Sequence, residues 1–198
     1  MRQIDYYMSV VSPWSYLCGT RPAEVAAKHG ATLVYRPVDP MALFARTGGL
    51  PLGQRHETRQ DYRFQELRRQ SIKAKMPLTL KPAFFPTNPA PAAYAIIAAQ
   101  DAGGGDLPRL VTSLCAACWA NEQNVAEDEV IQACLSAAGF SPGLTMSGMV
   151  MGADTYARNL EHAMLAGVFG VPFFVVGEEK FWGQDRIDDL DLFLSGGL

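Results

Sequence analysis

Residues 4–15 read IDYYMSVVSPWS, and this stretch determines how the fold begins. The run from Ile4 to Val11 is short, apolar and rich in aromatic residues, which predicts a buried strand. Ser12 and Pro13 follow directly. A serine hydroxyl caps free backbone N–H groups, and proline suits the first helical position, so this pair is typical of a helix start.

A β-α-β unit extends outward from this stretch. We expect a helix over 14–29 that ends at Gly30. Residues 32–36 alternate apolar and polar side chains, which predicts a second strand.

The middle of the chain predicts helices joined by loops. Residues 39–58 are rich in Gly and Pro and indicate a long irregular loop around a short apolar turn, and five prolines indicate a second loop over 76–91. Helices are expected over 59–75, 92–102, 107–121, 128–138 and 153–166. In the first of these, Tyr62, Leu67 and Ile72 are expected to face the core.

The end of the chain predicts a β-β-α unit. Residues 172–176 form an apolar run typical of a buried strand, and residues 180–182 follow as the second strand of a hairpin. A closing helix is expected over 185–194, with acidic residues near its start.

Composition excludes several classes of protein. The chain has 198 residues, of which 48% are hydrophobic and 19% charged, so it is expected to fold rather than remain disordered. Its net charge of −3 is of the wrong sign for neutralising nucleic-acid phosphates. No apolar run is long enough to cross a bilayer, and the N-terminus does not look like a signal peptide. We therefore expect a cytoplasmic protein whose four cysteines are reduced thiols.

Three short stretches are candidates for chemistry. Ser12 precedes a helix, where a hydroxyl and free N–H groups favour an anion, although its spacing alone favours a plain helix cap. The bond between Val171 and Pro172 enters a strand; a cis bond would leave the Val171 backbone open to an extended peptide, whereas a trans proline would simply start the strand. Gln184 and Asp185 open the last helix, where the carboxylate either caps the helix or binds a ligand ammonium group.

The pair Cys115 and Cys118 has redox spacing but the wrong context. Both lie in the middle of a predicted helix, without a helix N-terminus to lower a thiol pKa. No second Cys or His pair at zinc-ligand spacing accompanies them. We interpret both as packing residues, and no metal site is expected.

Taken in order, these motifs resemble one branch of a known superfamily. A strand, SPWS opening a helix, a helical insertion, GVFGVP at 167–172 and FWGQDR at 181–186 are similar to the DsbA-like proteins of the thioredoxin superfamily. Within that branch the chain resembles 2-hydroxychromene-2-carboxylate isomerases and their relatives, the kappa-class glutathione transferases. The resemblance implies an α/β thioredoxin-like fold: a discontinuous domain of residues 1–38 and 168–198, with a helical insertion domain over 39–167.

The resemblance also implies a glutathione site without a protein thiol. Disulfide oxidoreductases of this superfamily carry C-x-x-C where this chain has Ser12-Pro13-Trp14-Ser15, so no sulfur of the protein can attack a disulfide. Ser12 matches the serine that activates the glutathione sulfur. Val171, before a cis Pro172, matches the residue whose backbone pairs with the cysteinyl unit.

The remaining contacts to glutathione are implied in the same way. Gln184 and Asp185 match the pair that holds the γ-glutamyl end. The family uses an asparagine in the loop before the charged helix; Gln54 stands in that region as a substitute, and the contacts of the glycyl end depend on it. Arg69 matches an arginine of the helix after that loop.

The function implied is a glutathione-dependent isomerase of aromatic hydrocarbon catabolism, converting 2-hydroxychromene-2-carboxylate to trans-o-hydroxybenzylidenepyruvate. The alternative is a kappa-like transferase or peroxidase that consumes glutathione, and a non-catalytic peptide-binding module is a third possibility. Phe44, Phe84 and Phe85 are candidates for the wall of the aromatic-substrate site, with core packing as the equal alternative. Relatives are commonly dimers, so a homodimer is expected.

Overall fold

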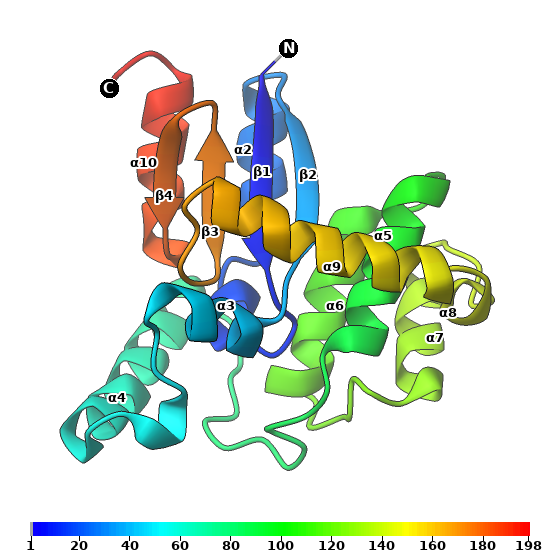
Figure 1. Ribbon diagram of the computed structural model, residues 1–198, viewed down its shortest axis with the longest axis horizontal. Helices are drawn as coiled ribbons and strands as arrows, with labels where there is room; N and C mark the ends of the chain where they lie inside the picture. Colours follow the sequence, from blue (N-terminus) through cyan, green and yellow to red (C-terminus); the bar gives the residue numbers. More distant parts are fainter. Residues whose placement is uncertain (1) are drawn as a thin grey trace.

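A four-stranded mixed sheet lies at the centre of the fold (Figure 1), in the order β2-β1-β3-β4. The structure is a computed structural model that describes residues 2–198. The central strand β1 (Gln3–Met8) runs parallel to β2 (Thr32–Pro37) and antiparallel to β3 (Phe173–Val176). Strand β4 (Glu179–Trp182) pairs with β3 as a hairpin. The first and last parts of the chain therefore build one sheet.

Helices cover both faces of this sheet. Helices α2 (Arg21–Lys28) and α10 (Ile187–Leu194) lie on one face, and α9 (Met149–Leu165) crosses the other (Figure 1). A group of helices packs beside β2: α5 (Ala90–Ala102), α6 (Leu107–Trp119), α7 (Asp128–Ala137) and the short α8 (Leu144–Ser147). No helix within residues 2–198 has the length and apolar character needed to span a membrane.

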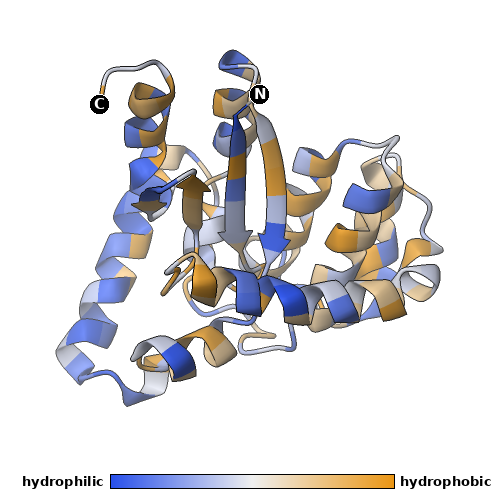
Figure 2. Ribbon diagram, turned by 45° about the horizontal axis from the view of Figure 1, so that its top comes forward, coloured by the Kyte–Doolittle hydropathy of each residue, from blue (hydrophilic) through white to orange (hydrophobic). Residues whose placement is uncertain are grey.

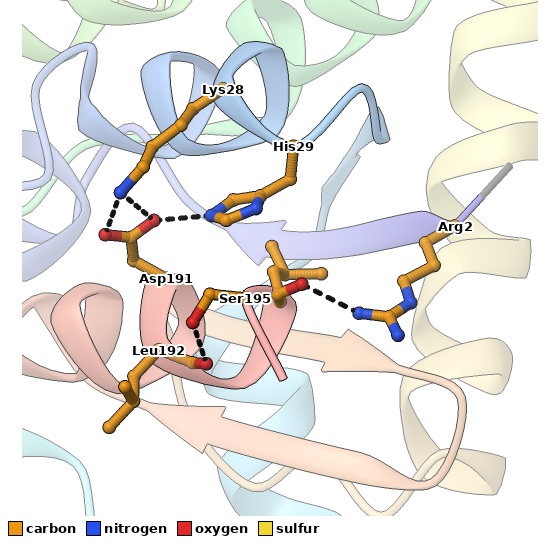
Figure 3. A network of polar contacts seen from close by, with 7 residues as sticks. Arg2, Lys28, His29, Asp191, Leu192 and Ser195 are labelled. Atoms are coloured by element: carbon orange, nitrogen blue, oxygen red, sulfur yellow. Dashed lines mark hydrogen bonds and ion pairs between the residues drawn. The ribbon is translucent and has the colours of Figure 1, made fainter. Parts of the chain in front are cut away.

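An ionic contact fastens α10 to α2 (Figure 3). Lys28 Nζ lies 2.9 and 2.7 Å from the two carboxylate oxygens of Asp191, and His29 Nε2 lies 2.6 Å from one of them. Arg2 donates to the carbonyl oxygen of Leu194 at 3.0 Å. These contacts tie the end of the chain to its first residues.

Aromatic residues fill the core between the sheet and the helices. The rings of Tyr6 and Phe174 stack at 4.6 Å between centroids, and Tyr6 also contacts Tyr35 at 5.6 Å. Trp119, at the end of α6, is fully buried. Strand β3 is hydrophobic along its length, whereas the helix α4 (Glu57–Ala74) is mostly hydrophilic (Figure 2).

The expected helix over 14–29 is broken, which corrects the sequence prediction. A single turn, α1 (Pro13–Tyr16), is followed by a separate α2 that starts at Arg21. Gly19 between them has a φ of +56°, a left-handed conformation that glycine adopts without steric cost. Pro22 lacks an N–H and favours the first turn of a new helix, so the chain restarts there.

The expected loop over 39–58 also contains helices. Helix α3 (Pro40–Thr47) begins where an Asp39 carboxylate oxygen accepts a hydrogen bond from the Met41 N–H, at 2.8 Å. It ends at Gly48, whose φ is +77°. A single 3-10 turn, η1 (Leu52–Gln54), then leads into α4. Asp39-Pro40 is itself a helix-start signal, which the number of glycines in this segment obscured.

The remaining elements follow the predictions, with small differences. The segment over 76–91 holds no helix or strand before α5 begins at Ala90, so this loop is confirmed, and so is the hairpin near the end of the chain. In α4 only Leu67 is buried; Tyr62 and Ile72 are 56% and 70% exposed, because the rest of this helix extends away from the core. Helix α9 starts at Met149 rather than at 153.

Candidate functional site

Ser12 lies at the carboxyl end of β1, where it caps α1. Its backbone is extended, and its hydroxyl oxygen accepts a hydrogen bond from the Ser15 N–H at 3.2 Å. The same hydroxyl donates to the carbonyl oxygen of Val171 at 3.3 Å. The residue is buried, with 6% of its surface exposed. Since α1 has only one turn, its dipole is weak, and the Ser12 hydroxyl is the main local donor.

Val171 faces Ser12 from the other end of the chain. The bond from Val171 to Pro172 is cis, so the open question from the sequence is answered in favour of the cis form. The Pro172 carbonyl oxygen accepts from the Gly183 N–H at 3.0 Å. Within residues 2–198, by contrast, no protein acceptor is present for the Val171 N–H. A backbone donor is thus available beside the serine.

Gln184 and Asp185 follow Gly183 on the turn η2 (Gln184–Arg186), which precedes α10. Gln184 is 7% exposed, and no group within the described residues forms a hydrogen bond with its side-chain amide. The Asp185 carboxylate is half exposed and pairs with Arg186 at 3.3 Å. An amide and a carboxylate therefore remain open to a ligand on this side of Pro172.

Arg21 positions this turn, and the sequence analysis did not identify it. Its Nη2 atom donates to the carbonyl oxygens of Gln184 at 2.9 Å and Leu17 at 3.3 Å, and its Nε atom donates to that of Cys18 at 3.4 Å. The guanidinium thus joins the short segment after α1 to the turn η2. An arginine just after a helix break is the only signal that the sequence carried for this role.

Gln54 and Arg69 lie apart from Ser12 in their contacts. Gln54 is exposed on η1 and has no hydrogen bond with Ser12 or Val171 among the described residues. Arg69 is exposed on α4, where it pairs with Glu66 at 2.6 Å and lies near the ring of Tyr62. The structure therefore brings Ser12, Val171 and the η2 turn together. Among the described residues, Gln54 and Arg69 form no hydrogen bond with this group.

Three of the four cysteines are buried and supply no reactive thiol. Cys18, Cys115 and Cys118 are buried, and burial raises the pKa of Cys18 and of Cys118 to about 12. Burial and the neighbouring Cys118 raise the pKa of Cys115 as well. All three thiols are protonated at neutral pH, as expected for packing residues. Within residues 2–198 no group of three metal-binding side chains occurs.

Two cavities accompany this geometry. The larger, of about 740 Å³, lies at the opposite end of β1, where Arg2, Asp5 and Val175 form part of its wall. It is distant from Ser12 along the strand, and its lining includes none of Ser12, Val171, Gln184 and Asp185. The smaller, of about 300 Å³, lies between η1, α4 and the segment 80–85.

The fold and the site define a thioredoxin-fold protein in which a serine caps the first helix. A family model for the DSBA-like thioredoxin domain matches residues 3–195, and the chain belongs to this family. The resemblance inferred from the sequence motifs is confirmed.

Two relatives match over nearly the whole chain. A 2-hydroxychromene-2-carboxylate isomerase of Sphingobium xenophagum is 26% identical over 196 residues, covering 98% of each chain. An enzyme of the same name from Pseudomonas putida is 25% identical over 192 residues, covering 93% of this chain and 90% of the relative. Among solved structures, a selenomethionine 2-hydroxychromene-2-carboxylate isomerase superposes with a TM-score of 0.79 at 21% identity, covering 98% of this chain and 95% of that one. The solved isomerase and this chain share the same fold.

Proposed function

We propose that this protein is a glutathione-dependent isomerase acting on 2-hydroxychromene-2-carboxylate. The observation that carries the proposal is the meeting of Ser12 and Val171, a hydroxyl and a backbone edge that together fit a cysteinyl thiol. The names of the two relatives support the choice of substrate. Glutathione, when bound, would supply the thiolate nucleophile that adds reversibly to the conjugated system of the substrate.

Ser12 would hold the sulfur as an anion. A free thiol has a pKa of about 8.5, so little of it is ionised at neutral pH. A hydrogen bond to a charged acceptor contributes roughly 1.5–3 kcal/mol, equivalent to about one to two pKa units. The Ser12 hydroxyl can turn from the Val171 carbonyl toward a sulfur, because its present bond of 3.3 Å is long. The serine keeps its own proton, and the thiol proton leaves to solvent.

The neighbouring groups would fix the rest of the tripeptide. The Val171 N–H and carbonyl would pair with the cysteinyl backbone, as a strand edge pairs with an extended peptide. The unpartnered Gln184 amide and the Asp185 carboxylate suit the amino-acid end of the γ-glutamyl unit. Free protein thiols at all four cysteines are consistent with a reducing compartment such as the cytoplasm, where glutathione stays reduced.

A kinetic assay with and without glutathione tests the proposal. We expect turnover of the hydroxychromene to need glutathione, and a sub-stoichiometric amount to support many turnovers while total thiol stays constant. Equal rates in its absence would refute the cofactor assignment. Loss of thiol with formation of a stable adduct would instead identify a kappa-like transferase, so product analysis separates the two enzymes.

A further inference from the structure

We propose that the 300 Å³ cavity between η1, α4 and the segment 80–85 is a binding site for an aromatic carboxylate. This inference deepens the proposed function. That the cavity holds the carboxylate of the substrate rests on the proposed function, whereas the binding of an aromatic carboxylate to the cavity does not. A volume of this size is at the lower end for small-molecule sites and suits one or two rings.

Four cations line the cavity. Arg59 and Arg63 lie one turn apart on α4, Arg55 precedes that helix at the same spacing, and Lys81 comes from the proline-rich segment. Arg59 and Arg63 therefore project from neighbouring turns of α4, and Arg55 reaches the same cavity from the extended backbone before that helix. Desolvation, with the nearby charge of Arg55, lowers the pKa of Arg63 to about 10, so this guanidinium remains charged at neutral pH.

These cations have no acidic partner within the described residues. None of the four takes part in an ion pair, and the side chains that line the cavity include no aspartate or glutamate. Arginines elsewhere on the protein, such as Arg36 and Arg69, do pair with carboxylates. Arg55 and Arg63 are partly buried, whereas Arg59 and Lys81 are exposed. The partly buried like charges repel one another unless an anion joins them, so the cavity is suited to a negative ligand.

The walls select an aromatic anion over a bare one. Lys81 Nζ lies 5.4 Å from the centre of the Phe64 ring, and the Arg63 guanidinium lies 5.9 Å from it. Phe85 completes the apolar side. The aromatic side of the cavity offers no donor to an oxygen that faces it, but it packs well on a ligand ring. A benzoate-like molecule places its ring on these walls and its carboxylate among the cations.

Side-chain contacts link the wall of the cavity to the backbone near Ser12. Phe85 packs on Trp119 with 4.9 Å between ring centroids. The indole N–H of Trp119 donates to the carbonyl oxygen of Val10 at 3.2 Å, two residues before Ser12. The wall of the cavity is thus held against the same strand end that carries the serine.

Calorimetric titration with salicylate, in the absence of glutathione, tests the site. We expect saturable binding that weakens with added salt, and at least 10-fold weaker binding of the neutral analogue salicylamide. Arg63→Gln and Lys81→Gln should each weaken salicylate binding by about 10-fold. Arg68→Gln, an exposed arginine on the same helix that does not line the cavity, should leave it within about 2-fold. Equal binding of the amide, or no effect of the two substitutions, would overturn the proposal.

Steady-state kinetics then separate this site from a glutathione contact. Arg63→Gln should raise the KM for the aromatic carboxylate by about 10-fold and leave the Kd for glutathione unchanged. A weakened Kd for glutathione with unaltered KM for the carboxylate would assign these cations to the glycyl carboxylate and overturn our assignment. Salicylate binding without any glutathione-dependent turnover would refute the proposed function while leaving the site itself supported.

Discussion

The hydroxyl of Ser12 and the carbonyl oxygen of Val171 lie 3.3 Å apart although 159 positions separate them in the chain. Their contact lies beyond the ends of the two central strands, after β1 and before β3, which pair with each other in the sheet. We expect Ser12→Ala to lower the glutathione-dependent rate by about 10²-fold, because one donor to a developing anion is lost. Stopped-flow absorbance at saturating glutathione measures this change.

Ser12→Thr is the matched control for that substitution. It retains both the hydroxyl and the acceptor for the Ser15 N–H, whereas alanine also removes the helix cap at a cost of about 0.5–2 kcal/mol. Thermal melts of both variants separate the two effects. An alanine variant with normal turnover would exclude Ser12 from the chemistry.

Arg21 is expected to act as a positioning residue for the turn η2. Arg21→Gln removes the donor that fixes the Gln184 carbonyl, so the Kd for glutathione should rise several-fold while the maximal rate changes little. Arg2→Gln is a suitable control, because Arg2 donates to a carbonyl oxygen in the same manner at a distant helix end. If both variants lose the same affinity, the effect comes from general loosening and not from the site.

The buried thiols should resist modification in the folded protein. Burial raises the pKa of Cys18 and Cys118 to about 12, so neither ionises appreciably at pH 8. Titration with a chromogenic disulfide should count at most one fast thiol, the partly exposed Cys134, and four after unfolding. The double variant Cys115→Ala, Cys118→Ala should keep its glutathione-dependent activity. Rapid reaction of several thiols in the native state would contradict the structure.

Acid should weaken the attachment of α10 to α2. Hydrogen bonds from Lys28 and His29 lower the pKa of Asp191, so its contribution to stability is present above the unfolded pKa of about 3.9 and is lost as pH falls through the lower folded value. Urea unfolding between pH 2 and pH 7 measures this dependence. Asp191→Asn should be less stable than the parent at pH 7, and the difference should shrink below pH 4. A constant difference across this range would exclude the ionic contribution.

The sheet and most helices were predictable because their signals are local. Apolar runs gave β1 and β3, and helix periodicity gave α5, α6 and α7. The break at Gly19 was missed because the apolar spacing continues across it, although Pro22 marks a restart. The exposure of Tyr62 and Ile72 was missed for another reason: periodicity identifies an apolar face, but only tertiary packing decides whether anything covers it.

The site was predictable where a motif carries it and not elsewhere. Ser12, Val171 and Gln184 lie in short motifs whose order indicated a shared site, and they come together in space. Arg21 and Trp119 act through contacts to carbonyl oxygens far along the chain, which no motif records. The spacing of Arg55, Arg59 and Arg63 was visible in the sequence. The sequence could not show that no carboxylate lies in the walls around them.

The order of strands in the sheet has a consequence for biosynthesis. Strand β1 leaves the ribosome well before its neighbour β3, because residues 9–172 of the chain separate the two strands. Until β3 has been synthesised, one side of β1 has no strand partner, and Ser12 lacks its contact with Val171. The candidate site can therefore assemble only after residues 171–176 have been synthesised, and a polypeptide that stops before β3 would carry the helices of the middle segment without Val171 and the η2 turn.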